Sequence, residues 1–436
     1  MLLSFTVPSS ARSLYVAALL ALAPSSALAG GAEWVVDLSG GAGSHFTDIQ
    51  SAIAFAQPND RVLVRAGNYS GFVLDKPIFV RGSVGTIVTG LARVQNIPSG
   101  ARCAVSRLQF RRLEVDDCDG GVVLESLASV PQTANVGSQV IVTDSDDVRI
   151  RACNFGVAFD YAACGEPGMS GVLLSNATLE LVSSTVWGQN AQWDTVACGN
   201  PPGAVTGGAG LNAFLSTFSL AHSTVRGGNG SGNSNGSGGD GGVGADFANG
   251  SRARLAASTL TGGMGGLGES CGCGGFWGDG RNSPAVRAIS MSLVRHSGVT
   301  ATGGAGGSCC GPAPAFSTSS NSQIQLSSPA RPTLQLVSAN AAGAVTLRVS
   351  GPANSTARVW LGRTMITPAP NTDVVGLLTN RARIQNLGAV PAGGQVDAFF
   401  TLPSSVETGE LVIAQADVLT ATGELLYSNS VCFTRP

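Results

Sequence analysis

The densest group of ionisable side chains in the sequence lies between Asp144 and Arg149, which reads Asp-Ser-Asp-Asp-Val-Arg. Paired carboxylates can hydrolyse a glycosidic bond, because one protonates the leaving oxygen while the other activates water. Asp144, Asp146 and Asp147, together with Arg149, are therefore the candidate catalytic residues. The competing interpretation, which the sequence favours, is a solvated turn that leads into a strand at Ile150.

A second acidic group, Asp116, Asp117 and Asp119, ends the preceding apolar segment. Hard oxygen ligands at this density could hold Ca²⁺, and the two acidic groups would face each other if their segments lay on neighbouring strands. These three carboxylates are the candidate metal ligands, and Ca²⁺ is the one candidate cofactor. Ordinary surface acids are the competing and favoured interpretation.

The three histidines do not complete a catalytic group. His222 and His296 occupy equivalent places in a repeated segment, two repeats apart, so roughly 10 Å would separate them at the spacing of stacked strands. A shared metal ion needs both nitrogens at about 2 Å, which excludes a common site. His45 lies elsewhere in the sequence, and structural or surface roles are favoured for all three.

Ten cysteines and an export signal indicate an oxidising compartment. Arg12 precedes an apolar run over 14–22, and Ala27-Leu-Ala29 has the form of a cleavage site. Residues 1–29 are therefore predicted to be a signal peptide, and the mature chain is expected to be secreted, extracellular or at the cell surface. No later stretch approaches the about 20 apolar residues of a membrane span, so no transmembrane segment is expected.

Most cysteines of an exported chain are expected to form disulfides. Cys164 and Cys198 share the sequence Ala-Cys-Gly-x-Pro in consecutive repeats, which favours a bridge between neighbours. For Cys271, Cys273, Cys309 and Cys310 a four-thiolate zinc site is the less favoured alternative. Cys153 is expected to remain a buried thiol. The predicted bridges are Cys164–Cys198, two bridges among Cys271, Cys273, Cys309 and Cys310 in either order, and Cys103–Cys118.

The charge balance excludes two classes of partner. The 436 residues include 25 lysines and arginines against 27 aspartates and glutamates, and Lys76 is the only lysine. Charged residues make up 12% of the chain, about half the usual share. Because no basic surface can form, neither nucleic acid nor anionic lipid is an expected partner.

Four segments of the chain repeat one pattern, and two looser copies begin near residues 110 and 150. Their alternation has a period of two and is bounded by Gly-Gly pairs, which favours short strands. One such unit cannot bury its apolar side alone, so stacked units forming a parallel β-solenoid are predicted. The four segments begin at Leu181, Leu220, Leu255 and Val294. The stack predicts an inward ladder of Ser184, Ser223, Ser258 and Ser297 beside an aliphatic ladder of Val186, Val225, Leu260 and Val299.

Glycine-rich inserts separate the repeats, roughly at 189–208, 228–242, 263–284 and 303–314. All leave the same position of the repeat, so all should emerge on one flank. Two interpretations stay open: flexible surface loops, or a layer with backbone pairing between neighbouring inserts. Such dense glycine carries a large ordering cost, which favours the loops.

Residues 32–90 resemble the amino-terminal cap and first coils of the right-handed parallel β-helix proteins of the pectin-lyase-like superfamily. In that family a short helix covers the open end of the solenoid, and Ile49 and Ile53 predict such a helix here, with Thr47 as N-cap. The resemblance implies a β-helix over 30–328. It leaves function open, because this fold hosts lyases, hydrolases, epimerases, adhesins and inert scaffolds. The matching residues are Trp34-Val-Val-Asp37, Phe46-Thr-Asp-Ile-Gln-Ser-Ala-Ile53 and Asn59-Asp-Arg-Val-Leu-Val-Arg-Ala-Gly-Asn-Tyr69.

Near residues 327–332 the repeat stops and glycine thins out. Alternating runs with turn signals indicate a small β-sandwich over 329–436. The predicted fold class is therefore all-β: a right-handed parallel β-helix followed by a small β-sandwich, with few contacts across a proline-bounded linker.

The expected function is that of a non-catalytic scaffold that binds glycan or matrix or serves as structure. Polygalacturonase-like members of the superfamily also carry an Arg-x-Lys motif, which this sequence lacks. A carbohydrate-active enzyme, either a polysaccharide lyase or a glycoside hydrolase, remains the alternative. Polysaccharide or extracellular matrix is the expected partner.

Overall fold

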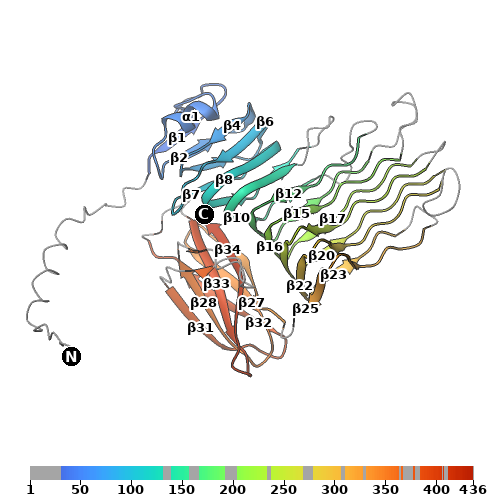
Figure 1. The fold of residues 1–436 in the computed structure, drawn as a ribbon. Helices are drawn as coiled ribbons and strands as arrows, with labels where there is room; N and C mark the ends of the chain where they lie inside the picture. The colour runs from blue at the N-terminus through green and yellow to red at the C-terminus, as the bar shows by residue number, and fades with distance from the viewer. Residues whose placement is uncertain are drawn as a thin grey trace, which may run out of the picture.

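The described residues form an almost entirely β protein (Figure 1). A large parallel sheet winds into a β-helix, and separate antiparallel sheets follow it toward the carboxyl terminus. The structure, a computed structural model, describes residues 31–130, 139–156, 166–191, 204–232, 237–268, 278–305, 310–327, 330–362, 365–366, 377–378, 383–404, 406 and 411–435.

Each coil of the β-helix contributes a strand to each of three faces, which we name by what they carry. The covered face lies under the antiparallel sheets, the threonine face carries a row of threonines, and the charged face carries arginine–carboxylate pairs. The covered face consists of β1 (Glu33–Val36), β2 (Arg61–Val64), β5 (Phe79–Gly82), β7 (Arg102–Ser106), the ends of β8 (Gln109–Glu125) and β10 (Val140–Arg151), β13 (Thr178–Val182), β16 (Thr217–Ala221), β19 (Arg252–Ala256), β22 (Leu293–Ser297) and β25 (Gln323–Leu326).

The long strands β6, β8 and β10 each belong to more than one face because they continue around a corner. The threonine face consists of β3 (Gly67–Tyr69), the starts of β6 (Thr86–Gln95) and β8, β9 (Ala128–Ser129), β11 (Asn154–Phe155), β14 (Thr185–Trp187), β17 (Thr224–Arg226), β20 (Thr259–Thr261) and β23 (Thr300–Thr302). The charged face consists of β4 (Phe72–Leu74), the end of β6, the middle of β8, the start of β10, β12 (Val172–Ser175), β15 (Leu211–Phe214), β18 (Ala245–Ala248), β21 (Val286–Ala288) and β24 (Phe316–Thr318).

The predicted stacking of the repeats is confirmed for the central coils. Leu181 pairs with Leu220 and Leu220 with Leu255, and all three are fully buried. The aliphatic ladder is also in register, since Val186 pairs with Val225. Alternation places these side chains inward, where successive coils bury them in one continuous apolar core.

Two of the proposed repeat starts are wrong. Leu255 pairs with His296 rather than with Val294, so the last coil is shifted by two residues. A shift of two leaves the inward and outward alternation unchanged, and the hydrophobic pattern therefore cannot detect it. The copy near residue 110 is also misplaced, because Leu124 is the residue that pairs with Ile150. The same shift removes the supposed equivalence of His222 and His296.

Serines at one corner of the coil form the predicted ladder. The Ser184 amide donates to Ser223 Oγ at 3.1 Å, and the Ser223 amide donates to Ser258 Oγ at 3.1 Å. The residue before each serine has a positive φ, as at His222 (50°), which turns the chain between two faces. Ser297 does not join this ladder, because it pairs with Ala256 on the covered face.

A short helix closes the amino-terminal end, as predicted. α1 (Ile49–Phe55) buries Ile49, Ala52 and Ile53 against the first coil. Its N-cap is Asp48, whose carboxylate accepts from the Ser51 amide at 2.8 Å. The prediction of Thr47 as N-cap was therefore one residue early.

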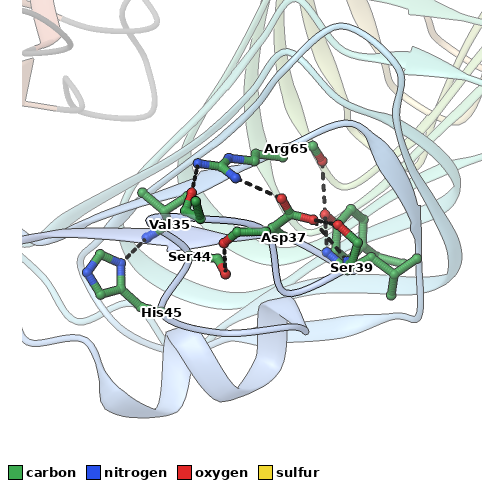
Figure 2. A network of polar contacts seen from close by, with 10 residues as sticks. Val35, Asp37, Ser39, Ser44, His45 and Arg65 are labelled. Atoms are coloured by element: carbon green, nitrogen blue, oxygen red, sulfur yellow. Dashed lines mark hydrogen bonds and ion pairs between the residues drawn. The ribbon is translucent and has the colours of Figure 1, made fainter.

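The loop before this helix is held by a polar network (Figure 2). Arg65 donates to Asp37 at 2.8 Å and to the Ala42 carbonyl at 2.9 Å, while the Ser39 hydroxyl donates to Asp37 at 2.6 Å. The hydrogen bonds from Ser39, with help from Arg65, lower the pKa of Asp37 to about 2. His45 Nδ1 accepts from the Val35 amide at 3.0 Å, so this histidine fixes the loop.

The glycine-rich inserts form a layer that extends from the corner between the threonine and charged faces (Figure 1). We call their described residues the glycine layer: the outbound segments 188–191, 226–232, 262–268 and 303–305 and the return segments 166–171, 204–210, 237–244, 278–285 and 310–315. Within it, the Gly228 amide donates to the Gly208 carbonyl at 2.8 Å and the Gly242 amide to the Gly228 carbonyl at 2.7 Å. The interpretation with backbone pairing between inserts is confirmed for these residues.

Burial along the outbound segments has a period of three. Thr261, Met264 and Leu267 are partly or fully exposed, whereas the two glycines between each pair of them are buried. Three residues per turn is the period of an extended polyproline II helix, which makes no hydrogen bonds within itself. The backbone groups are instead free to bond neighbouring inserts, so the layer needs glycine where segments touch.

The antiparallel sheets near the carboxyl terminus share one apolar core, built around Leu347, Val359 and Ala416. The last strand of the β-helix ends at Leu326, and the first strand of these sheets begins at Thr333. One sheet orders β26 (Thr333–Ala339), β27 (Ala344–Ser350) and β32 (Gln395–Thr401); the other orders β31 (Arg383–Ala389), β28 (Thr356–Gly362), β33 (Leu411–Leu419) and β34 (Leu425–Thr434); β29 (Met365–Ile366) pairs with β30 (Leu377–Leu378).

Candidate functional site

A corner of the coil divides the predicted acidic site. Asp116 lies on the charged face, where it accepts a hydrogen bond from the Thr143 hydroxyl. Asp144 sits at the corner with a φ of 44° and accepts from Asn176 at 2.7 Å. Asp146 is exposed beyond it, and Asp147 has already passed to the covered face. The cluster that is compact in sequence is therefore spread around an edge.

Asp147 and Arg149 form an ion pair of 2.6 Å on the covered face. The Arg149 side chain is only 7% exposed, and its register neighbour on the next coil is Glu180. Such a buried position gives this pair a structural role in the covered face. The interpretation of the segment as a turn leading into a strand fits this geometry.

The predicted calcium ligands are not gathered into a site. Asp117 occupies the corner with a φ of 52°, and Asp119, two residues further along the same coil, is exposed to solvent. Among the residues that the structure describes, no three histidine, cysteine or acidic side chains are grouped as a metal ion would require. Adjacent coils do bring Asp116 beside Thr143 and Gln95, but neither neighbour is a carboxylate.

The predicted Cys103–Cys118 bridge is wrong, because both residues are free buried thiols. Cys118 occupies a corner like that of the ladder serines: its amide donates to Ser145 Oγ at 3.2 Å and its thiol lies 3.3 Å from the Asp116 carbonyl. Burial raises the pKa of both thiols. Cys153 is a free thiol as expected, and burial raises its pKa to about 12.

The other predicted bridges lie almost wholly outside the described residues. Cys310 is disulfide-bonded, and its partner is not among the described side chains. The pairings therefore stay predictions. The positions outside the described part are Cys164, Cys198, Cys271, Cys273 and Cys309.

The charged face pairs its carboxylates with arginine. Glu114 accepts from Arg93 at 2.9 Å and lies 2.7 Å from Arg112. Four coils further along, Asp246 accepts two hydrogen bonds from Arg287, at 2.9 and 2.6 Å. These pairs join successive coils, so they read as structural ladders.

The carboxyl-terminal sheets dock on the covered face, which sequence reasoning missed. Glu180 is buried there and accepts hydrogen bonds from the Ser430 amide, at 2.8 Å, and from the Ser430 hydroxyl. Beside it Trp360 and Ile413 pack against Val123. The outward-facing apolar residues of this face were the available signal, and the expectation of few contacts between the two parts is wrong.

Glu180 should make this docking stronger at acid pH. Burial, acting against the nearby Arg149 and the Ser430 hydrogen bonds, raises the pKa of Glu180 above its usual 4.5, and Asp147 raises it further. A carboxyl group with a raised pKa in the folded state takes up a proton on folding. Its stabilising contribution is therefore complete below the usual pKa and is lost as the pH rises through the raised one.

We expect the urea midpoint of the wild type to rise between pH 8 and pH 5 by more than that of Glu180→Gln, which cannot titrate. Glu424→Gln changes an exposed glutamate and serves as the matched control. An equal pH response in the wild type and Glu180→Gln would contradict this assignment.

A pocket of about 220 Å³ lies at the joint between the β-helix and the carboxyl-terminal sheets. Its walls include Ser297, Gly298, Arg331, Thr333 and Gln395. The lining contains neither a carboxylate nor a histidine, so it offers no acid–base pair for hydrolysis.

The threonine face presents ordered rows of side chains, all but one of them uncharged. Thr185, Thr224, Thr259 and Thr300 are in register on successive coils, and the last three are exposed. A second row begins two residues further along each strand. Its members are Trp187, Arg226, Thr261 and Thr302, and the Arg226 guanidinium lies 5.4 Å from the centre of the Trp187 ring.

The glycine layer extends this face with further rows. Asn190 and Asn229 continue the second row three residues on: the Asn229 amide donates to Asn190 Oδ1 at 2.7 Å, and the Met264 amide donates to Asn229 Oδ1 at 3.1 Å. Hydroxyls, amides, one indole and one guanidinium thus share one surface without a carboxylate among them. Such groups can hydrogen-bond and stack on a polar ligand, and they cannot perform acid–base catalysis.

Fold and face together define a class of protein: an all-β parallel β-helix with a neutral polar face continued by a glycine layer. No family model and no curated protein matches the sequence. Similar solved structures include a DUF3823 family protein from Bacteroides ovatus, with 18% identity, a TM-score of 0.20 and coverage of 28% of this chain. This chain spans 60% of that protein.

A further similar structure is the enzymatically active domain of tailspike protein 2 of bacteriophage CBA120. It has 10% identity and a TM-score of 0.24, and the match covers 93% of this chain and 76% of that one. Likeness at these TM-scores carries no functional argument. Within the part of the chain that the structure describes, no helix has the length and apolar character needed to span a bilayer.

Proposed function

We propose that this chain is an exported, non-catalytic β-helix protein of the pectin-lyase-like kind that binds glycan through the threonine face. One observation carries the proposal. The rows of Thr, Asn, Trp and Arg side chains lie in register on one surface, and the described side chains of these rows include no carboxylate.

The chemistry of these rows suits neutral polysaccharide. Hydroxyl and amide groups can exchange hydrogen bonds with sugar hydroxyls, and the partly exposed Trp187 ring can stack on the apolar face of a sugar ring. The Arg226 guanidinium lies 5.4 Å from the centre of that ring and adds hydrogen-bond donors beside it. The near-neutral charge of the chain, −2 overall, fits a partner recognised without charge pairing.

The enzyme alternative lacks a comparable observation among the described residues. Its candidate acids are spread around a corner or paired with arginine. A positive activity assay would assign the chain to the polysaccharide lyases or to the glycoside hydrolases.

The test is a panel of polysaccharides assayed for binding and for cleavage, the latter by reducing ends and by absorbance of unsaturated uronides, with and without Ca²⁺. We expect binding without cleavage. Trp187→Ala and Arg226→Ala should each weaken binding by about 1–2 kcal/mol, as loss of a stacking or charged hydrogen-bonding group does.

Arg252→Ala is the matched control, because Arg252 is exposed on β19, away from the threonine face. It should leave the affinity unchanged. Cleavage that depends on Asp144 or Asp147, or binding that ignores the Trp187 and Arg226 substitutions, would overturn the proposal.

A further inference from the structure

We infer that the threonine face binds the surface of an ordered, insoluble neutral glycan rather than a single soluble chain. The inference deepens the proposed function and rests on it. It follows from three properties of the face: its extent, its rigidity and the difference between the two sides of the glycine layer.

The face is large and regular. Coils repeat at about 4.8 Å, and residues two apart on a strand are separated by about 6.7 Å. In the glycine layer, residues three apart are separated by about 9.3 Å. From Thr259 through Thr261 and Met264 to Leu267, the positions on one coil and its insert therefore extend over about 25 Å. The first two rows continue in register across four coils.

A surface of that size exceeds one sugar ring in both directions, and its contact groups recur at fixed intervals. The two largest side chains of these rows, Trp187 and Arg226, lie against each other. A ligand that uses several rows at once must itself present groups at regular intervals in two dimensions. An ordered polymer surface does so, whereas one dissolved chain can follow only one row.

The face is held rigid by its backbone. The asparagine amides of the layer are fixed, since Asn190 and Asn229 each accept a hydrogen bond from the main chain of the next insert. Beneath them, the Gly227 amide donates to the Thr261 carbonyl at 2.9 Å and the Gly263 amide to the Gly242 carbonyl at 2.7 Å. Groups already held in place lose little entropy on binding, and a rigid array gains most from a rigid partner.

The opposite side of the layer has different chemistry. Its return segments expose Thr206, Asp240 and Arg281, and the Arg281 amide donates to Asp240 Oδ1 at 2.6 Å. This side continues into the charged face, where Asp246 and Arg287 are paired. Arg226 is the one charged side chain in the described rows of the threonine side, so this is the side that suits an uncharged solid.

Several weak contacts that engage at once can raise the affinity by about 10²–10⁴ over a single contact. This ratio sets the size of the effect that the test should measure. The full chain is incubated with microcrystalline cellulose and with chitin powder, and separately with the soluble hexasaccharides of the same sugars. We expect binding to at least one solid to be about a hundredfold tighter than to its soluble hexasaccharide.

Thr259→Tyr places a bulky ring on the exposed first row, which should lift an ordered surface away from the neighbouring rows. We expect it to reduce binding to the solid by about tenfold or more and to reduce hexasaccharide binding by a clearly smaller factor. Arg252→Tyr adds the same ring at an exposed site off the face and should change neither. Circular dichroism and the urea midpoint of each variant establish that it is folded.

Equal affinity for solid and soluble forms, or equal losses of both in Thr259→Tyr, would overturn this inference and leave glycan binding by the face intact. Absence of binding to any polysaccharide in the wild type would overturn the proposed function, and this inference with it.

Discussion

Gly242→Ala should separate the glycine layer while the β-helix beneath it stays folded. A Cβ atom on Gly242 would lie 1.9 Å from the Gly208 carbonyl oxygen. No side-chain rotation can relieve this clash, because the backbone fixes the position of a Cβ atom and the carbonyl belongs to the backbone. The Gly242 amide also donates to the Gly228 carbonyl at 2.7 Å, so a shift that relieves the clash breaks this bond as well.

We expect Gly242→Ala to cost about 3 kcal/mol in the stability of the layer, in the range of severe single substitutions. Amide exchange of Gly208, Gly228 and Gly263 should accelerate, and limited proteolysis should cut the inserts first. Gly393→Ala is the matched control, because a Cβ atom there has no heavy atom within 4 Å. Unchanged exchange in Gly242→Ala would show that the inserts are loops rather than a bonded layer.

Val225→Asp should destabilise the β-helix itself. Val225 is 0% exposed and stacks between Val186 and Leu260 in the aliphatic ladder. A carboxylate at this position would lose its hydration without gaining a partner, a cost of about 4 kcal/mol or more. The urea unfolding midpoint should fall accordingly.

Thr224→Asp provides the matched comparison, since Thr224 is the preceding residue and is exposed. Because alternate residues of a strand point to opposite sides, the same new side chain should cost less than about 1 kcal/mol there. Similar losses in both variants would contradict the assignment of inward and outward positions.

The repeat pattern predicts which residues point inward, but it does not predict the register of each coil. The inward placement of Val225 follows from alternation alone, and the sequence predicted it correctly. The last coil was misplaced by two residues, so that Val299 was assigned to a ladder position that Ala301 occupies. Any even shift preserves the alternation, and only the pairing of whole strands distinguishes one even shift from another.

The acidic candidates illustrate a different limit. Asp144, Asp146 and Asp147 are neighbours in the sequence, which made them a plausible site. Asp144 is itself a corner residue with a positive φ, and the chain turns there. The three side chains therefore leave in different directions. Proximity along a strand that bends around a corner says little about proximity in space.

Local sequence patterns are enough to predict the stacked coils, the helix at the amino-terminal end and the flank from which the inserts leave. These features depend on local alternation, on capping and on where insertions interrupt a repeat, and each is written within a few residues. Tertiary structure alone decided that Glu180 meets Ser430 across the covered face and that Gly228 bonds Gly208 and Gly242 in neighbouring segments. Such contacts join backbone and side chains far apart in the chain, and glycine carries no side-chain pattern from which its partners could be predicted.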